Sequence, residues 1–460
     1  MIKSKQLMQR VLLFGIVPVI ALASLIVLAG GPATSNNLPL ASGPRLVSIQ
    51  ALPEMDTSGP MCQLMPAAAS ETLYAALMQA PAGASAQATP GDLRNAIKDR
   101  PPLRVIKDPY PTYSAVAMDF THDEIVLLDE NLFQVMAYDR TANTPASATM
   151  TEPKRVIGGH NTKIEFNCGL YIDPKNGDIY AVNNDTLDTL VIFNREAKGD
   201  VPPTRELSTP HRTYGIAVDE VAEEMFLTVQ DAPQVVVYKK SASGEDRPIR
   251  VLRGNKTLLA DAHGLSLDTK NGWMFVANYG NAADYNEQTQ RQGGQVSSFG
   301  GRVPGSGRFV APSISVYPIK AEGDTAPIRV ISGPKTKLDW PAHIFVDENH
   351  GDLYVANDGG HSVLVFKTTD SGDVAPYRVI SGPKSNIKNP TGVHVDPKND
   401  ELVVANMGNH MATVYPRTAN GDVAPKRVIR AAPLDTPALQ IGNPGAVAYD
   451  TKRDEILVPN

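Results

Sequence analysis

The sequence contains few cysteines and no excess of positive charge. Only two of its 460 residues are cysteines, Cys62 and Cys168, so neither a disulfide framework nor a cysteine-rich metal site can form. Its 43 basic and 49 acidic residues give a formal net charge of −6, which offers no electrostatic case for nucleic-acid binding. The chain also lacks the G-x-S-x-G, H-E-x-x-H, P-loop and CxxCH motifs. These absences exclude functions with an obvious sequence signature and leave assembled sites open.

Long apolar runs are rare as well, and one stands at the start of the chain. Residues 11–31 (VLLFGIVPVIALASLIVLAGG) follow three basic residues and precede a small, polar stretch, which is the pattern of an export signal. A run of about 20 apolar residues is also long enough to span a bilayer. We therefore expect residues 1–33 to be a hydrophobic helix that is either a signal peptide or a signal anchor. The rest is expected to be exported, periplasmic or extracellular, and in the second case anchored by residues 11–31.

The next segment, residues 34–101, is rich in Ala, Pro, Ser, Gly and Gln. Because this composition buries little apolar surface, it predicts a linker with little fixed structure. Within it, residues 71–80 (ETLYAALMQA) have the character of a short helix.

The remainder, residues 102–460, is built from a repeated unit. In its clearest copy, residues 342–382, four short runs rich in Val, Ile, Tyr and Phe are bounded by Gly, Asn, Asp or Pro. Such runs are typical of antiparallel β-strands. A single four-stranded sheet cannot bury both of its faces, so it needs neighbours of its own kind.

The first strand of the unit ends in an aspartate, and this marker recurs seven times. The markers are Asp119, Asp173, Asp219, Asp268, Asp347, Asp396 and Asp450. The last unit stops after its second strand, whereas residues 98–106 align without a gap with the fourth strand at residues 372–380. An N-terminal strand that completes the last sheet would close a ring and remove exposed sheet edges. We therefore predict an all-β fold, a seven-bladed β-propeller of four-stranded antiparallel blades over residues 102–460.

Three motifs carry a family resemblance: P-x-G-[IV]-x-V-D at Pro390 to Asp396, the run DLYVAN, and the turns at His361 and His410. With these motifs, residues 102–460 resemble NHL-type repeats and, more loosely, YVTN-type and lactonase-like bacterial propellers. NHL domains commonly have six blades, whereas seven units are counted here. The resemblance implies ligand binding on the face where the second strands end. It does not select a function, because such propellers include hydrolases, lyases, and binding and scaffold modules.

On that face the starts of first strands and the ends of second strands are expected to meet. First-strand starts supply Tyr214, His263 and His343. Second-strand ends supply Asn183, Asn278, Asn357 and Asn406, with Asp358 beside them. A hard divalent cation prefers several oxygen ligands, which makes Asn183, Asn278 and Asn357 weak candidates for a metal site. Because the asparagine recurs in most units, we favour a structural role in ending the strand.

His263 and His343 are the two weak catalytic candidates, because both fall on this face in adjacent units. Each suits a general base or a metal ligand. Each also suits a structural role at the channel mouth, with the ring bonded to a neighbouring carbonyl, and we favour that interpretation.

The strongest irregularity is an insertion at residues 279–312, between the second and third strands of the fourth unit. Loops longer than about 15 residues in a compact fold are usually functional or disordered. Its Tyr285, Arg291, Phe299 and Arg308, among many Gly, Gln and Ser residues, indicate an adaptable contact surface. We expect these four residues to bind a partner together with Tyr214, Asn278, Asn357, Asp358 and Asn406.

Two functions remain after this reading. The first is an exported binding or scaffold module for a protein or carbohydrate partner, with no nucleic acid and with membrane contact only through the N-terminal segment. The second is a lactonase-like hydrolase or metal-assisted lyase that uses His263 or His343 at the channel mouth. No cofactor is identified in the sequence, and occupancy by a divalent cation stays open.

Overall fold

The structure is a computed structural model that describes residues 108–185, 187–283, 285, 305–438, 448–450 and 455–457. The predicted signal at residues 1–33, the linker at 34–101 and the N-terminal strand at 98–106 lie outside these ranges. Across the described ranges, no helix has the length and apolar character needed to cross a membrane. Regular structure there consists of short β-strands and four single-turn 3-10 helices.

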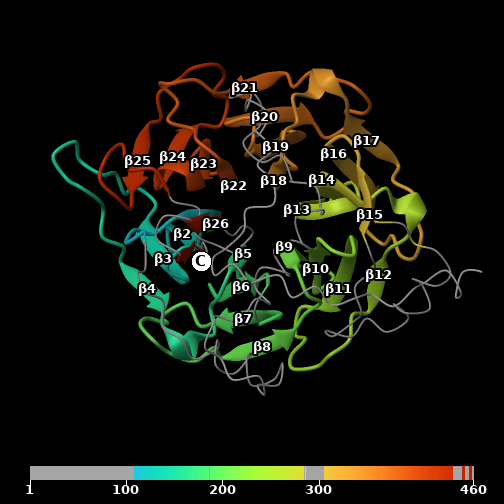
Figure 1. The fold of residues 1–460 in the computed structure, drawn as a ribbon, viewed down its shortest axis with the longest axis horizontal. Coiled ribbons are helices and arrows are strands. Elements are labelled where there is room, and N and C mark those ends of the chain that lie inside the picture. Colours follow the sequence, from blue (N-terminus) through green and yellow to red (C-terminus); the bar gives the residue numbers. More distant parts are fainter. Residues whose placement is uncertain are drawn as a thin grey trace, which may run out of the picture. The chain divides into compact units, whose positions relative to one another are not determined.

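Six four-stranded antiparallel sheets, the blades, follow one another in sequence order (Figure 1). Blade 1 consists of β1 (Tyr113–Asp119), β2 (Glu124–Asp129), β3 (Gln134–Asp139) and β4 (Arg155–Gly158). Blade 2 consists of β5 (Asn167–Ile172), β6 (Ile179–Asn183), β7 (Thr189–Phe193) and β8 (Arg205–Ser208). Blade 3 consists of β9 (Thr213–Asp219), β10 (Glu224–Val229), β11 (Gln234–Lys239) and β12 (Arg250–Leu252).

The second half of the ring repeats this plan, with one extra strand in blade 4. Blade 4 consists of β13 (Ala260–Asp268), β14 (Trp273–Ala283), β16 (Ser313–Pro318) and β17 (Arg329–Ser332), with β15 (Gly305–Phe309) paired to the end of β14. Blade 5 consists of β18 (Pro341–Asp347), β19 (Asp352–Asn357), β20 (Ser362–Lys367) and β21 (Arg378–Ile380). Blade 6 consists of β22 (Pro390–Asp396), β23 (Glu401–Asn406), β24 (Met411–Pro416) and β25 (Arg427–Arg430). The 3-10 turns are η1 (His160–Thr162), η2 (Asn255–Thr257), η3 (Pro334–Thr336) and η4 (Met407–Asn409).

Each blade is held to the preceding one by its loop between the third and fourth strands. That loop places a glycine in a parallel bridge with the fourth strand of the preceding blade, as Gly199 does with Ile157 and Gly421 does with Ile380. The same clasp closes the ring, because the β3–β4 loop of blade 1 holds β25 of blade 6. There Thr144 N donates to Val428 O at 2.7 Å, and Arg430 N donates to Thr144 Oγ1 at 2.8 Å.

The predicted seven blades are therefore wrong, and the propeller has six. Blade 1 packs directly on blade 6, where Thr391 Oγ1 of β22 donates to Tyr113 O of β1 at 3.2 Å. The seventh unit contributes β26 (Ala448–Asp450) and β27 (Glu455–Leu457), which form a separate two-stranded sheet. Strand patterns show where strands form, but the clasp between blades decides how many strands enter the ring.

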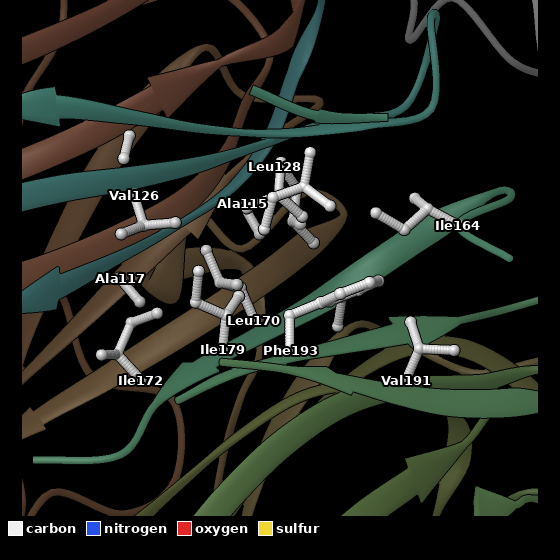
Figure 2. Close-up of a cluster of buried hydrophobic side chains, with 14 residues drawn as sticks. Ala115, Ala117, Val126, Leu128, Ile164, Leu170, Ile172, Ile179, Val191 and Phe193 are labelled. Carbon is white, nitrogen blue, oxygen red and sulfur yellow. The ribbon is translucent and has the colours of Figure 1, made fainter. Parts of the chain in front are cut away.

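The hydrophobic core lies between neighbouring blades. Figure 2 shows one such layer, in which Val126 and Leu128 of blade 1 pack with Ile172, Ile179 and Phe193 of blade 2. Five further clusters include corresponding layers, one of them between blades 1 and 6. Fully burying one such side chain stabilises the fold by about 1.5–3 kcal/mol, so the layers between blades carry most of the cohesion.

Small residues bring the first strands together around the central channel. A Cβ added to Gly169 would lie 2.5 Å from the carbonyl oxygen of Tyr214, and one added to Gly264 would lie 2.5 Å from that of Ala342. Neither distance is tolerable, so these positions need glycine for the close approach of adjacent blades. In blade 5 the equivalent position, four residues before the terminal aspartate, holds His343 instead.

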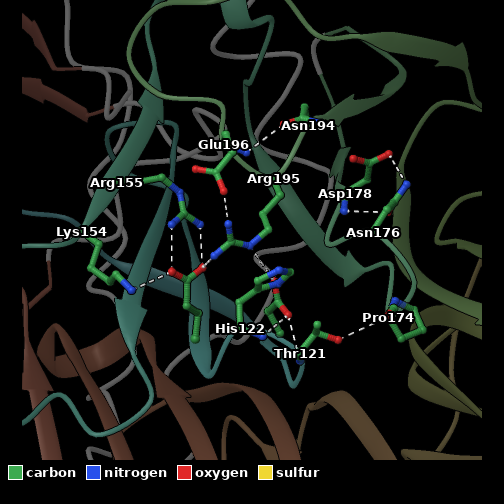
Figure 3. A network of polar contacts seen from close by, with 12 residues as sticks. Thr121, His122, Lys154, Arg155, Pro174, Asn176, Asp178, Asn194, Arg195 and Glu196 are labelled. Atoms are coloured by element: carbon green, nitrogen blue, oxygen red, sulfur yellow. Dashed lines mark hydrogen bonds and ion pairs between the residues drawn. The ribbon is translucent and has the colours of Figure 1, made fainter.

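At the opposite end of the blades, where the second strands begin, buried carboxylates are paired with cations. Three cations that Figure 3 labels, Arg155, Lys154 and Arg195, lie 2.7, 2.8 and 3.4 Å from the carboxylate of Glu124. Burial alone would raise the pKa of Glu124, but hydrogen bonds from Arg155 and Lys154 outweigh it and lower that pKa to about 2. Glu224, Asp352 and Glu401 have the same arrangement in their own blades.

Candidate binding site at the channel mouth

Two rings of residues surround the channel mouth at which the second strands end. The inner ring consists of the residues that enter the first strands, seven positions before the terminal aspartate: Thr112, Phe166, Arg212, Asp261, Trp340 and Asn389. The outer ring consists of the residues that follow the strand-end position: Glu130, Asn184, Gln230, Tyr279, Asp358 and Met407. In five blades the outer-ring residue donates a backbone hydrogen bond to the inner-ring residue of the same blade, as Asp358 N does to Trp340 O at 3.0 Å. The repeat thus delivers twelve variable side chains to one face.

Five aromatic side chains at these and adjacent positions contact one another in a continuous series of stacked and tilted pairs, which we call the aromatic column: Trp340, Tyr279, His263, Tyr214 and His343. Successive ring centroids are 5.2, 3.3, 4.3 and 5.2 Å apart. The column joins blades 3, 4 and 5. His263 is buried, and the other four residues are partly buried. The three candidates Tyr214, His263 and His343 are therefore brought into direct contact.

His343 crosses the channel. Its Nε2 lies 2.8 Å from the carbonyl oxygen of Cys168 in blade 2, which is three blades away from blade 5 in the ring of six. Because a carbonyl oxygen only accepts, Nε2 carries the proton and donates it. Burial lowers the pKa of His343 to about 4, so the imidazole is neutral at neutral pH. The side chain that replaces a glycine in blade 5 therefore narrows the channel just below the mouth.

His263 is held through both of its ring nitrogens. Nδ1 lies 3.0 Å from the carbonyl oxygen of Asp261, and Nε2 lies 2.9 Å from Nε2 of Gln230. The Gln230 amide donates to Nε2, which leaves the proton on Nδ1 for the Asp261 carbonyl. Burial lowers the pKa of His263 to about 3. This histidine is therefore neutral and fixed, and it sets the orientation of the column.

Three carboxyl groups lie near the aromatic column, and burial raises the pKa of each one. The pKa of Glu130 rises to about 8, with the charges of Asp129 and Asp358 adding to the effect of burial. The pKa of Asp261 rises to about 7 because burial outweighs the nearby Arg212. The pKa of Asp358 rises to about 6, although Asn389 Nδ2 donates to its carboxylate at 2.9 Å. Within the described part of the chain, no lysine or arginine forms an ion pair with any of the three.

The strand-end asparagines lie beneath this surface, and their side-chain amides form hydrogen bonds within the blades. Asn357 Oδ1 accepts from Asp339 N at 2.7 Å, and its Nδ2 donates to Lys337 O at 3.0 Å. Asn183, Asn278 and Asn406 accept a backbone N–H in the same way, at 2.9, 3.1 and 3.3 Å. All four are buried. Among the residues with described positions, no group of three or more His, Cys, Asp and Glu side chains is arranged to hold a metal ion.

The insertion begins as a β-hairpin that prolongs blade 4 at the mouth. β14 continues beyond Asn278 and pairs with β15, which places Arg308 opposite Ala282. Tyr285 is buried, and its hydroxyl donates to Pro233 O of blade 3 at 2.6 Å. The stem of the insertion is thus attached to the two blades that carry most of the aromatic column. Arg291 and Phe299 lie outside the described residues.

A groove of about 880 Å³ lies beside the mouth, between blades 1 and 2. Its apolar lining comprises Leu132, Phe133, Ile164, Leu187 and Pro202. Phe133 and Leu187 are 38% and 40% exposed, so the groove presents apolar side chains to solvent. The groove is therefore a separate apolar surface between blades 1 and 2, and no residue of the aromatic column lines it.

The sequence interpretation did not identify Trp340, Glu130, Gln230 or Asp261 as site residues. The signal was nevertheless present, because each occupies a fixed offset from a strand-end marker that the repeat defines. Aligning the units on those markers and reading the columns that vary would have selected both rings.

No family model matches the sequence, and no curated protein matches it. The resemblance to NHL-type repeats therefore has no support from a family match. Among solved structures the chain is similar to the β-propeller domain of Cps50 (Swd1) from Myceliophteria thermophila, with 10% identity over 72% of this chain and 90% of that chain and a TM-score of 0.43. It is similar to hydrazine synthase of Kuenenia stuttgartiensis, with 11% identity over 77% and 97% and a TM-score of 0.44. It is also similar to a chain of a nidogen–laminin complex, with 13% identity over 70% and 95% and a TM-score of 0.41.

Proposed function

We propose that this propeller is a binding module and that the channel mouth receives its partner. The observation that carries the proposal is the aromatic column, five rings from three blades that contact one another in series on one face of the propeller. Large aromatic side chains that are partly exposed at such a face are the usual anchors of binding sites. The β-propeller fold itself commonly serves as a binding or scaffold module.

A protein partner fits the surroundings of the column better than a carbohydrate. The groove with Phe133 and Leu187 and the stem of the insertion extend the contact surface well beyond a site for one or two sugar rings. Stable protein interfaces bury about 800 Å² on each side, which needs such a wide face. We also propose that the module works outside the cytoplasm, on the evidence of the apolar run at residues 11–31.

The test is capture of a partner from an extract of the native cell envelope by immobilised protein. Trp340→Ala removes one end of the aromatic column and is expected to abolish capture of the partner. Phe120→Ala is the matched control, because Phe120 is 40% exposed beside the opposite end of the channel, where it stacks on His394. A partner that the Trp340 variant retains and the Phe120 variant loses would overturn the proposal.

A further inference from the structure

Charge is distributed at the mouth in a way that the aromatic column alone does not explain. Glu130 of blade 1 and Asp358 of blade 5 are close enough for the charge of Asp358 to act on Glu130. Asp358 and Asp261 also act on the hydroxyl groups of Tyr214 and Tyr279, both members of the column. Two of the column's rings therefore lie within reach of carboxylates from more than one blade.

Glu130 and Asp358 differ from Glu124, Glu224 and Glu401, each of which is paired with an arginine, in forming no ion pair with a lysine or arginine in the described part of the chain. Glu401, for comparison, is bonded to Arg427 at 2.6 Å and to Lys426 at 2.7 Å. In the described part of the chain no hydrogen bond or ion pair reaches the carboxylate of Glu130, and Asp358 receives only the neutral amide of Asn389. At the mouth, Arg212 acts on Asp261, whereas Glu130 and Asp358 lie near the aromatic column without an ion pair to a lysine or arginine among the described residues.

The arrangement of carboxyl groups and rings at the mouth favours a large cation with diffuse charge over a small metal ion. The carboxylates come from separate blades and do not converge on a point, which disfavours a small metal ion that needs several ligands at one distance. A larger cation with diffuse charge can lie against an aromatic face and gain from the ring quadrupole, while nearby carboxylates contribute at longer range. Trp340 is the strongest ring for this purpose, and it stands at the end of the column, where Tyr279 is its only ring neighbour among the described residues.

We infer that the channel mouth binds an organic ammonium cation, carried either by a small amine or by a lysine side chain of a protein partner. This inference rests on the proposed function and names the group that the mouth recognises. Both sources present the same chemistry, a positive nitrogen on an aliphatic stem. The aromatic column contacts the aliphatic stem and the positively charged nitrogen, and Glu130 and Asp358 supply the countercharge.

The experiment is calorimetric titration of the purified protein with two matched pairs of probes. The first pair is choline and its uncharged isostere 3,3-dimethylbutanol, which represents a small amine. The second pair is the methylamide of Nα-acetyl-lysine and the same compound acetylated on Nε, which represents a partner's lysine. We expect the charged member of at least one pair to bind about tenfold or more tightly than its neutral counterpart. Preference for the first or the second pair then identifies the source of the cation.

Variants locate the effect. Glu130→Gln combined with Asp358→Asn is expected to weaken the charged probe about tenfold and to leave the neutral probe unchanged. Trp340→Phe should keep most of the affinity, whereas Trp340→Ala should lose it. Glu223→Gln is the control, because Glu223 has a 71% exposed side chain and precedes β10 at the opposite end of the blade.

Affinity should also rise with pH between about 6 and 9, because the mouth carboxyls lose their protons in this range. The pKa of Glu130 is about 8, and its surroundings include the carboxyls of Asp129 and Asp358. The neutral residues Cys168 and Tyr214 also lie near Glu130. Equal affinity of a charged probe at about pH 6 and about pH 9, or equal affinity of a charged probe and its neutral isostere, would overturn the inference. If the titration gives such a result while Trp340→Ala still abolishes capture of a protein partner, the proposed binding function stands and only the inference of an ammonium cation is overturned.

Discussion

Buried carboxyl groups at the two ends of the propeller differ in the partners that surround them. At the end where second strands begin, Glu224 and Glu401 lie among arginines and lysines that hold the pKa of each carboxyl at about 2. At the mouth, Glu130 and Asp358 lie among aromatic rings without such partners, and burial raises the pKa of these carboxyls to about 8 and 6. The contrast separates groups that stabilise the ring from groups that remain available to a ligand.

Removing a paired carboxylate should have the largest effect. Glu401 has a side chain only 4% exposed and also contacts Arg140 of blade 1 at 3.3 Å, so it connects the two blades that close the ring. Glu401→Ala removes the buried carboxylate that Arg427 and Lys426 share and is expected to lower the free energy of unfolding by about 3–5 kcal/mol. Urea unfolding measures this change. Glu223→Ala, an exposed control, should change it by less than about 0.5 kcal/mol, and a similar small loss for Glu401→Ala would contradict the account.

Lowering the pH should have the next largest effect on stability, because it protonates the same carboxylates. The folded pKa of about 2 for Glu124, Glu224 and Glu401 lies below the ordinary value of 4.5, so their stabilising contribution is complete above about pH 4.5 and lost toward pH 2. The lowered pKa values of His263 and His343, about 3 and 4, add a loss that begins near pH 6.5. Melting temperature should therefore fall most steeply below about pH 4.5, because above that pH the raised pKa values of Glu130, Asp261 and Asp358 offset the loss from the histidines. Glu224→Gln should be less stable at pH 7 and show a flatter fall below pH 4.5.

Neutralising a mouth carboxyl should have a smaller effect of the opposite sign. A folded pKa of about 8 for Glu130 means that the folded protein prefers the protonated form, so its charge costs stability above that pH. Glu130→Gln mimics the protonated form and should stabilise the protein at pH 9 by about 1 kcal/mol, after allowance for partial exposure of the side chain. At pH 5 the variant and the wild type should melt together. Destabilisation at pH 9 would show that the carboxylate has a cationic partner.

Shortening the insertion should have the smallest effect on stability. Replacing residues 286–304 with a short Gly-Ser linker keeps the paired stem of β14 and β15 and the buried Tyr285. Loop length changes stability only slowly, so the melting temperature should stay within about 2 °C. Deleting residues 281–310 instead removes the stem and the Tyr285 contact with Pro233, and it should lower the melting temperature. Equal effects of the two deletions would contradict the structural role of the stem.

The sequence predicts the propeller and most of its strands because both depend on local patterns. The run at Pro390 to Asp396 was assigned from alternation and turn residues alone, and it is β22 in the structure. The number of blades is a different kind of property, since it depends on which loop clasps β25. In blade 1 that loop has Thr144 in place of the glycine bridge of other blades, so the repeat pattern gave no sign of it.

The mouth shows the same limit. Tyr214, His263 and His343 were found because they are unusual residues at the start of a strand. Trp340 and Glu130 lie one step outside the strands, where the sequence pattern shows only turn residues. The lack of a cation near Glu130 is a property of six blades brought together, and no single stretch of sequence contains it.

The central claim is that the mouth carboxyls are buried without cations while those at the opposite end are paired. Carbon-detected NMR titration of protein labelled at glutamate carboxyl carbons, recorded for the wild type and for Glu130→Gln, tests it directly. The account predicts one resonance that titrates near pH 8 and is missing from the variant, and three that remain charged to below about pH 3. A spectrum in which every glutamate titrates near its ordinary value of 4.5 would contradict it.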